Sequence, residues 1–144
     1  MTPFLVRRID HVVFRVRDLQ ASIAFYQRAL GCVVARVRDD LGLVHLRAGA
    51  SMIDLVSVDG PLGSAGGAAP QPQGRNVDHL CLRIEPFHEA ALAAHLQACG
   101  AAPRGPATEN FGAEGQGLSL YVADPDGNII ELKGPATPAA PGSP

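Results

Sequence analysis

The stretch IDHVVFRV at residues 9–16 recurs as VDHLCLRI at residues 77–84. Both copies contain Asp-His at the same point, an Arg four residues after the His, and apolar residues around them. Val, Ile and Leu are typical of β-strands, so both copies are predicted to form strands. A recurring segment of this kind indicates that the chain consists of two similar halves.

Each copy is followed by a segment with the features of a helix. The first is DLQASIAFYQRALG (18–31), with apolar residues at roughly helical spacing, Asp18 as a plausible N-cap and Gly31 as a C-terminal stop. The second is PFHEAALAAHLQACG (86–100), which is rich in alanine and ends at Gly100. Two helices are therefore predicted at matching places in the two halves.

Three shorter runs typical of strands follow each predicted helix. In the first half they lie at 33–38, 43–48 and 51–58; in the second, they are a weak run within 101–108 and clearer runs at 118–123 and 128–133. A turn, ADPDGN, is strongly indicated at 123–128 by its proline and glycine. Each half therefore reads β-α-β-β-β, which makes the predicted fold class α+β.

The predicted domain organisation follows from this repeat. A first module covers 8–58 and a second covers 77–134, separated by a linker at 59–76 that is rich in Gly, Ala and Pro. The tail at 135–144 has no periodicity and little to bury, so we expect it to be flexible.

The composition bounds the function classes. The chain has 144 residues, 47% hydrophobic and 18% charged, with a net charge of −2, so nucleic-acid binding is not expected. No apolar run approaches the length of a membrane span, and the charged N-terminus does not resemble a signal peptide. Cys32, Cys81 and Cys99 show no C-x-x-C spacing, which favours a reducing compartment. A cytoplasmic protein is expected.

Four polar residues lie on strands that are otherwise apolar. Because residues two apart on a strand share a face, His11 and His79 occupy matching positions, as do Asp54 and Glu131. One histidine in a strand is more often a hydrogen-bonded core or edge residue than a ligand. A carboxylate in a buried strand, however, needs a charged partner. Two histidines and a carboxylate in the same repeat frame favour a metal site with open positions.

The paired strands, the first helix and the ending YVADPDGNIIEL (121–132) together resemble one known group of proteins. This group is the vicinal oxygen chelate superfamily, which contains glyoxalases, fosfomycin-resistance proteins and extradiol dioxygenases. The resemblance covers about residues 8–134. It implies two tandem βαβββ modules that form a cup-shaped mixed sheet around one divalent metal ion. It also implies a homodimer and a small-molecule substrate.

The resemblance assigns the metal ligands residue by residue. His11 matches the first-strand ligand of the family, His79 the ligand that opens the second module, and Glu131 the final carboxylate ligand. Asp54 falls where glyoxalase I has a fourth ligand, usually Glu, and is one methylene shorter. The implied metal is Zn, Ni, Mn or Fe, bound once per site.

The first of several possible chemistries is that of a glyoxalase-type lyase or isomerase. Here the metal stabilises an enediolate while Glu131 moves the proton. Arg15 and Arg75 match arginines that hold substrate carboxylates in glyoxalase I, whereas Val58 replaces a polar substrate contact. The expected function is thus a metal-dependent enzyme, of lyase or isomerase type, that acts on a small substrate through two adjacent oxygens.

The resemblance leaves three alternatives open. In a fosfomycin-type thiol transferase, Tyr121 would lie beside the substrate and ENFGAEGQG (109–117) would be a glycine-containing loop. In an extradiol-type dioxygenase, Fe(II) would occupy the site, with Tyr121 or His45 as a further catalytic residue. A metal-free drug-binding protein of the bleomycin-resistance type belongs to another class, and its members generally lack the ligand set found here.

Overall fold

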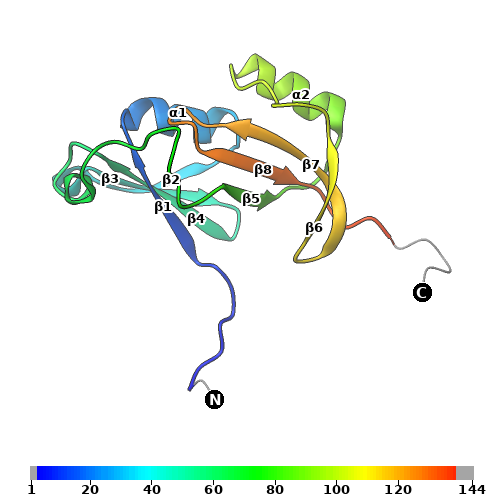
Figure 1. Ribbon diagram of the computed structural model, residues 1–144, viewed down its shortest axis with the longest axis horizontal. Helices are drawn as coiled ribbons and strands as arrows, with labels where there is room; N and C mark the ends of the chain where they lie inside the picture. The colour runs from blue at the N-terminus through cyan, green and yellow to red at the C-terminus, as the bar shows by residue number, and fades with distance from the viewer. Residues whose placement is uncertain (1–2, 139–144) are drawn as a thin grey trace. The chain divides into compact units, whose positions relative to one another are not determined.

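The structure is a computed structural model that describes residues 3–138. The chain divides into two compact units between Gln71 and Pro72, inside the segment expected to be a linker. Each unit contains one helix and one four-stranded mixed sheet (Figure 1). The predicted α+β fold of two tandem βαβββ modules is therefore confirmed.

The first unit follows the predicted element order closely. Its elements are β1 (His11–Val16), α1 (Leu19–Arg28), β2 (Val33–Arg38), β3 (Leu43–Ala48) and β4 (Ser51–Ser57), with short 3₁₀ turns at Asp39–Leu41 and Gly63–Gly66. The strand order in the sheet is β1-β4-β3-β2. β1 runs parallel to β4, whereas the other neighbours are antiparallel.

The second unit repeats this topology. Its elements are β5 (His79–Arg83), α2 (Glu89–Ala98), β6 (Thr108–Gly112), β7 (Gly115–Ala123) and β8 (Ile129–Lys133). The strand order is β5-β8-β7-β6, again with one parallel pair, β5 and β8. The first strand of each module therefore pairs with its last strand. As a result, His11 lies on the strand next to that of Asp54, and His79 lies on the strand next to that of Glu131.

The two helices begin in different ways. The side chain of Asp18 accepts a hydrogen bond from Ala21 N at 2.9 Å and caps α1, as the sequence predicts. His88 precedes α2 without any side-chain cap, and this helix starts three residues after Pro86. Gly31 has a φ of 69°, in the left-handed region that favours glycine, directly after the end of α1.

One face of each sheet is apolar and forms the core of its unit. In the first unit Tyr26 of α1 is fully buried and stacks on Phe14 of β1, with ring centroids 6.5 Å apart. In the second unit Leu96 of α2 is fully buried. Burying a side chain of this size stabilises the fold by roughly 1.5–3 kcal/mol. Further core residues in the strands are Val16, Leu46, Ile53, Leu55, Leu120, Val122, Ile130 and Leu132.

The weak strand predicted within 101–108 is misplaced. The structure has a strand at Thr108–Gly112, which begins at the last residue of that run and continues into the segment 109–117 that the resemblance suggested was a loop. It forms a hairpin with β7, where Thr108 pairs with Ser119. β6 is an edge strand whose residues are mostly exposed, so it lacks the apolar alternation that reveals buried strands.

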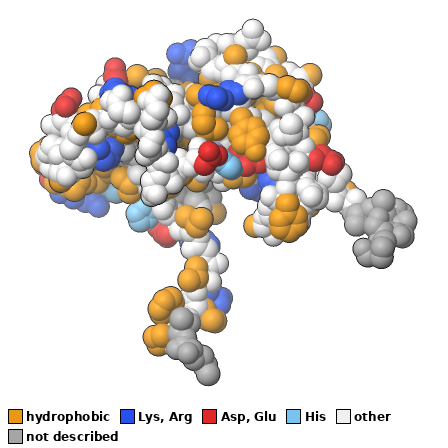
Figure 2. All heavy atoms as spheres, viewed as in Figure 1, with side chains coloured by type: hydrophobic (Ala, Val, Ile, Leu, Met, Phe, Trp, Pro, Cys, Tyr) orange, Lys and Arg blue, Asp and Glu red, His pale blue; other side chains and the backbone are white. Residues whose placement is uncertain are grey.

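The two ends of the described chain differ in structure. Residues 3–10 extend away from β1 and carry exposed hydrophobic side chains, including Leu5 and Val6 (Figures 1 and 2). At the other end, Thr137 N donates to Gln116 O at 2.7 Å, so the start of the expected tail lies beside β7. The rest of that tail, 139–144, lies outside the described residues. Within residues 3–138, no helix is long and apolar enough to cross a membrane.

Candidate functional site

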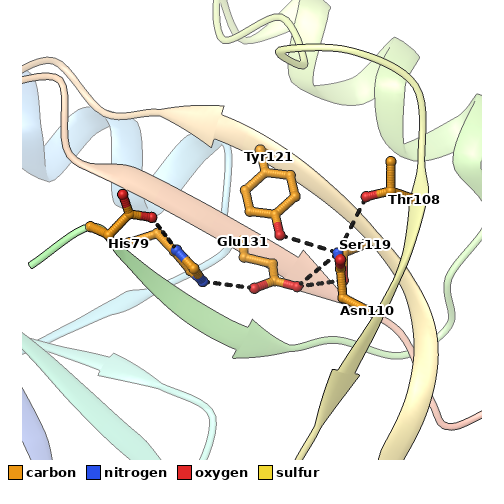
Figure 3. A network of polar contacts seen from close by, with 7 residues as sticks. His79, Thr108, Asn110, Ser119, Tyr121 and Glu131 are labelled. Atoms are coloured by element: carbon orange, nitrogen blue, oxygen red, sulfur yellow. Dashed lines mark hydrogen bonds and ion pairs between the residues drawn. The ribbon is translucent and has the colours of Figure 1, made fainter.

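Glu131 is a buried carboxylate near the middle of β8, with only 5% of its surface exposed. Its Oε1 accepts hydrogen bonds from Ser119 Oγ at 2.6 Å and from Asn110 Nδ2 at 3.4 Å. Its Oε2 lies 3.0 Å from His79 Nε2. Figure 3 shows these side chains converging on the carboxylate from the neighbouring strands. The two carboxylate oxygens therefore have different surroundings.

The strand register explains why these residues meet. Glu131 pairs with Cys81 on β5 and with Tyr121 on β7, and directly paired residues of a sheet point to the same face. Because residues two apart also share a face, Ser119 on β7 and His79 on β5 point to that face as well. The sequence motif alone did not reveal Ser119 or Asn110, because neither stands out until β6, β7 and β8 are aligned.

His79 is oriented by the residue that precedes it. Its Nδ1 lies 2.7 Å from Asp78 Oδ2, and this hydrogen bond raises the pKa of the imidazole. Partial burial opposes the rise in pKa, and the charge of Glu131 adds to it. Since Nδ1 is engaged by Asp78, Nε2 is the nitrogen that faces Glu131. A carboxylate behind a histidine is the arrangement that orients histidine ligands in metal sites.

Tyr121 lies on the same face as Glu131. Its hydroxyl accepts a hydrogen bond from Asn110 Nδ2 at 3.1 Å, and its ring contacts the edge of His79 with centroids 5.7 Å apart. Burial, and then the nearby charge of Glu131, raise the pKa of Tyr121. The phenol therefore stays protonated at neutral pH and keeps its O–H available as a donor.

Cys81 shares this face but does not have the properties of a nucleophile. Cys32, Cys81 and Cys99 form no disulfide. Desolvation of the Cys81 thiol, with a smaller contribution from Glu131, raises its pKa to about 11. The thiol is therefore protonated at neutral pH, and the thiolate is the reactive form.

The first unit contains a related set of side chains. Asp54 on β4 is 6% exposed, and its Oδ2 lies 2.9 Å from His45 Nδ1 on β3. Its Oδ1 is buried and has no hydrogen-bond partner among the described residues. On the neighbouring strand, His11 Nδ1 lies 2.8 Å from Asp10 Oδ1, and this bond, followed by the charge of Asp54, raises the pKa of His11.

The two units place these side chains at equivalent positions of equivalent strands. His11 corresponds to His79, Asp54 to Glu131 and His45 to Tyr121. The sequence alone gave little reason to select His45 as a site residue, because its position beside Asp54 depends on the pairing of β3 with β4. The register shows that it is the direct neighbour of Asp54.

The exposure of the two motif histidines differs from the sequence-based expectation. Their strands were expected to bury the face that carries them, but the side chains of His11 and His79 are 49% and 35% exposed. The opposite face of each sheet is the one that its helix covers, as the burial of Phe14 and Val16 on β1 shows. An apolar strand of this kind therefore leaves its polar face accessible to a ligand.

Comparison with known proteins places the chain in a family. Residues 8–132 match the Glyoxalase/Bleomycin resistance protein/Dioxygenase superfamily. The chain belongs to this superfamily. The match extends from before β1 into β8, so it includes both modules and both sets of polar residues described above.

Several members of the superfamily are similar to this chain over most of their length. Virulence protein STM3117 of Salmonella typhimurium is 30% identical over 128 residues, which cover 89% of this chain and 84% of that protein. Its crystal structure has a TM-score of 0.71 at 25% identity, covering 92% of this chain and 100% of that chain. The glyoxalase domain-containing protein RDO1 of Mycosarcoma maydis is 36% identical, covering 88% of this chain and 68% of that protein. Ethylmalonyl-CoA/methylmalonyl-CoA epimerase of Cereibacter sphaeroides is 28% identical, with coverages of 90% and 98%.

The donor atoms of the chain fit the divalent metal that is typical of this superfamily. Within residues 3–138, no cluster of three or more His, Cys, Asp or Glu side chains is arranged to hold a metal ion. The predicted ligands occur instead as two pairs, one in each unit. In both pairs Nδ1 of the histidine bonds the preceding aspartate, so Nε2 is the nitrogen that could coordinate a metal; in His79 this Nε2 now lies 3.0 Å from Glu131 Oε2. The unpartnered Asp54 Oδ1 is a further unused oxygen donor.

The structure gives the two predicted substrate-binding arginines partners within the protein. Arg15 donates to carbonyl oxygens of the segment 63–68, including Gly63 O at 2.9 Å. Arg75 donates to Asn128 Oδ1 at 3.0 Å and to Asp126 O at 2.6 Å. Both guanidinium groups therefore support loops of their own unit, and their role in substrate binding stays a prediction.

Proposed function

We propose that this chain is a divalent-metal-dependent enzyme that acts on a small substrate through two adjacent oxygens, in a reaction of lyase or isomerase type. The observation that carries the proposal is Glu131, a buried carboxylate with one oxygen fixed and the other facing an oriented histidine. The similarity to an epimerase over nearly the whole chain supports an isomerisation. A reaction of this type needs a base that takes a proton from carbon and returns it.

The proposed metal ligands are His11, His79 and Glu131, with Asp54 as a fourth. Their nitrogen and oxygen donors suit Zn, Ni, Mn or Fe. When bound, the metal stabilises negative charge that develops on the substrate oxygens. The proposed ligand set is compatible with a site made by one chain and with a site completed by a second copy of the chain.

Glu131 is the proposed proton-transfer residue. Ser119 and Asn110 both donate to Oε1, so their hydrogen bonds hold that oxygen in place. Oε2, which faces His79 Nε2 at 3.0 Å, is the oxygen proposed to exchange a proton with substrate carbon. A carboxylate fixed through one oxygen needs little reorganisation during proton transfer.

Tyr121 is the proposed hydrogen-bond donor to the substrate. Its hydroxyl oxygen accepts from Asn110 Nδ2, and the hydroxyl also hydrogen-bonds with Glu131, so in this proposal its proton passes from Glu131 to a substrate oxygen when substrate binds. A neutral donor at this place stabilises charge that forms on the oxygen as Glu131 removes a proton.

We further propose that the protein is a cytoplasmic homodimer. The support for association is the row of hydrophobic side chains before β1, where Leu5 and Val6 are 77% and 84% exposed. Sedimentation velocity tests this: deletion of residues 1–9 should shift the particle from two chains to one, and a monomeric full-length chain would contradict the proposal.

Metal analysis tests the enzymatic proposal first. Elemental analysis of the purified protein should find one divalent ion per site, lost in both His79→Ala and Glu131→Ala. Glu109→Ala, which removes an exposed carboxylate from the adjoining hairpin, is the matched control and should keep its metal. Zn or Ni would favour an isomerase or lyase, Mn the thiol-transfer alternative and Fe the dioxygenase alternative. A protein that takes up none of these ions contradicts the proposal and favours a drug-binding role.

A proton-exchange assay tests the reaction class. Methylmalonyl-CoA, a substrate in the name of the epimerase relative, is the first compound to use. The metal-loaded protein in D₂O should catalyse exchange of the proton next to the thioester carbonyl, and Glu131→Gln should lower the exchange rate by at least about 100-fold.

A further inference from the structure

Lys133 is the only lysine of the chain, because the remaining members of its 12 Lys and Arg residues are all arginines. It lies at the end of β8, two residues after Glu131, so both side chains point to the same face of the sheet. Only 6% of its surface is exposed. A single, buried lysine beside the proposed proton-transfer residue is a feature that neither the fold nor the proposed metal site requires.

The ammonium group of Lys133 has no counterion. Its Nζ is buried and makes no hydrogen bond to any of the described residues. Two acidic groups of the same unit already have partners, Glu131 with Ser119 and His79, and Glu114 with Arg83 at 2.5 Å. A buried ammonium without an anion costs several kcal/mol, so this group is expected to gain one in the functional state.

Two glycines keep open the space in which the Lys133 side chain lies. A Cβ on Gly112 would be 2.7 Å from Lys133 Cε, and a Cβ on Gly117 would be 2.7 Å from Lys133 Nζ. Neither glycine has a positive φ, so the backbone does not require glycine at these positions. The missing side chain at Gly112 therefore leaves room for the lysine, and at Gly117 it leaves room for the lysine and for Pro135 O, which would lie 2.6 Å from such a Cβ.

We propose that the Lys133 ammonium binds an oxyanion of the substrate, a carboxylate, while Glu131 acts on the adjacent carbon framework. This inference rests on the proposed function of Glu131. Residues two apart on a strand are separated by roughly 7 Å, which places the anion only a few bonds from the reacting carbon. The substrate class is thus a small acid whose carboxylate lies close to its reacting centre.

Access to Lys133 depends on the β6–β7 hairpin, whose residues Gly112 and Gly117 contact its side chain. The turn of this hairpin is tied to β5 by the ion pair between Glu114 and Arg83, and Arg83 is the direct strand neighbour of Lys133. Both partners are exposed, and exposed ion pairs of this kind contribute little to stability. This ion pair is therefore a weak restraint on the turn, whereas the backbone pairing of β6 with β7 holds the hairpin itself.

The single lysine allows a direct test. Metal-free protein grown with ¹³C-lysine gives one set of lysine Cε signals, which are followed during titration with sodium malonate at constant ionic strength. We expect a saturable shift of this signal. By calorimetry, Lys133→Met should weaken malonate binding at least tenfold, whereas Arg104→Met, which removes an exposed charge from the same unit, should change it less than twofold.

A second variant perturbs the lysine without removing its charge. In Gly112→Ala the three atoms nearest to the new methyl group belong to Lys133, so this change should displace the ammonium and also weaken malonate binding at least tenfold. If circular dichroism shows that Lys133→Met is unfolded, malonate binding by Gly112→Ala provides the test instead.

Several results would overturn the proposal. Absence of a saturable lysine shift with malonate means that Lys133 is structural, as does equal weakening in Lys133→Met and Arg104→Met. A shift with inorganic phosphate but not with malonate overturns the carboxylate and assigns a phosphate. The metal content of the same preparations distinguishes failure of this inference from failure of the proposed function. A wild-type protein that binds no metal contradicts the proposed metal-dependent activity. The lysine signal in the malonate titration reports only on the carboxylate site.

Discussion

Among single residues, the buried carboxylate of Glu131 is distinguished by the different partners of its two oxygens. The oxygen bound by Ser119 and Asn110 is held by neutral donors, whereas the other faces the imidazole of His79. Hydrogen bonds to a carboxylate stabilise its charged form when water is excluded. The hydrogen bonds from Ser119 and Asn110 therefore offset part of the cost of burying this carboxylate in an otherwise apolar strand.

Ser119→Ala tests this arrangement. Removing a hydroxyl that donates to a buried carboxylate should lower the free energy of unfolding by about 1–3 kcal/mol. If Glu131 is a metal ligand, metal affinity should fall by about 10-fold or more, because the ligand loses its support. Urea denaturation and metal titration measure the two effects. Ser64→Ala, which removes an exposed hydroxyl in the other unit, should change stability by less than about 0.5 kcal/mol.

Asp78→Asn tests the orientation of His79. The Asp78 carboxylate is the largest cause of the raised pKa of His79, so the substitution should lower that pKa. Titration of the His79 ring protons by NMR in the metal-free protein measures the change. Asp59→Asn, an exposed carboxylate in the other unit, should leave the His79 titration unchanged. An equal pKa in Asp78→Asn and wild type would contradict the assigned role of Asp78.

The same shift predicts how stability depends on pH. The pKa of His79 is higher in the folded protein than its ordinary value of 6.5, so protonated His79 stabilises the fold. This contribution is fully present below pH 6.5 and is lost as the pH rises through the folded pKa. The free energy of unfolding of metal-free wild type should therefore fall more steeply over this window than that of Asp78→Asn.

At the scale of elements, the two helices occupy matching places but differ in how they begin. Asp18 caps α1 with its side chain, whereas His88 at the start of α2 makes no such bond. The repeat thus preserves the position of the helix but not its capping chemistry. Leu96 of α2 is fully buried, so burial of this side chain stabilises a helix whose start has no side-chain cap.

Alanine substitutions at the two cap positions should therefore have unequal effects. Asp18→Ala should lower the free energy of unfolding by about 1 kcal/mol, because a backbone N–H at the start of α1 loses its partner. His88→Ala should change it by less than about 0.5 kcal/mol. Chemical denaturation measures both. Equal losses would show that the cap of Asp18 contributes little.

At the scale of the whole molecule, the chain is two units that each contribute one histidine and one carboxylate to the predicted ligand set. A metal that binds only the folded protein raises its stability in proportion to the logarithm of ligand excess, by about 2.7 kcal/mol at 100 times the dissociation constant. Thermal unfolding with added Zn²⁺ should therefore shift upward in wild type and return on addition of a chelator.

His79→Ala and His11→Ala should each abolish most of this shift. His88→Ala, an exposed histidine on neither sheet, serves as the control and should keep it. Retention of the full shift in both motif variants would show that the metal binds elsewhere.

Much of this protein follows from its sequence by itself. The repeat of IDHVVFRV as VDHLCLRI, with a helix after each copy, was sufficient to predict two βαβββ modules, because local periodicity and glycine stops act over short distances. The same repeat identified His11, Asp54, His79 and Glu131, since strand alternation fixes which residues share a face.

Only the tertiary structure reveals the partners of those residues. Ser119, Asn110 and His45 acquire roles through pairing between strands that are distant in sequence, and register between strands is not encoded in either strand alone. The edge strand β6 was missed for a related reason, because an exposed strand needs no apolar pattern. The isolation of Lys133 is likewise a property of three-dimensional packing, since a buried charge is recognised only when its surroundings are known.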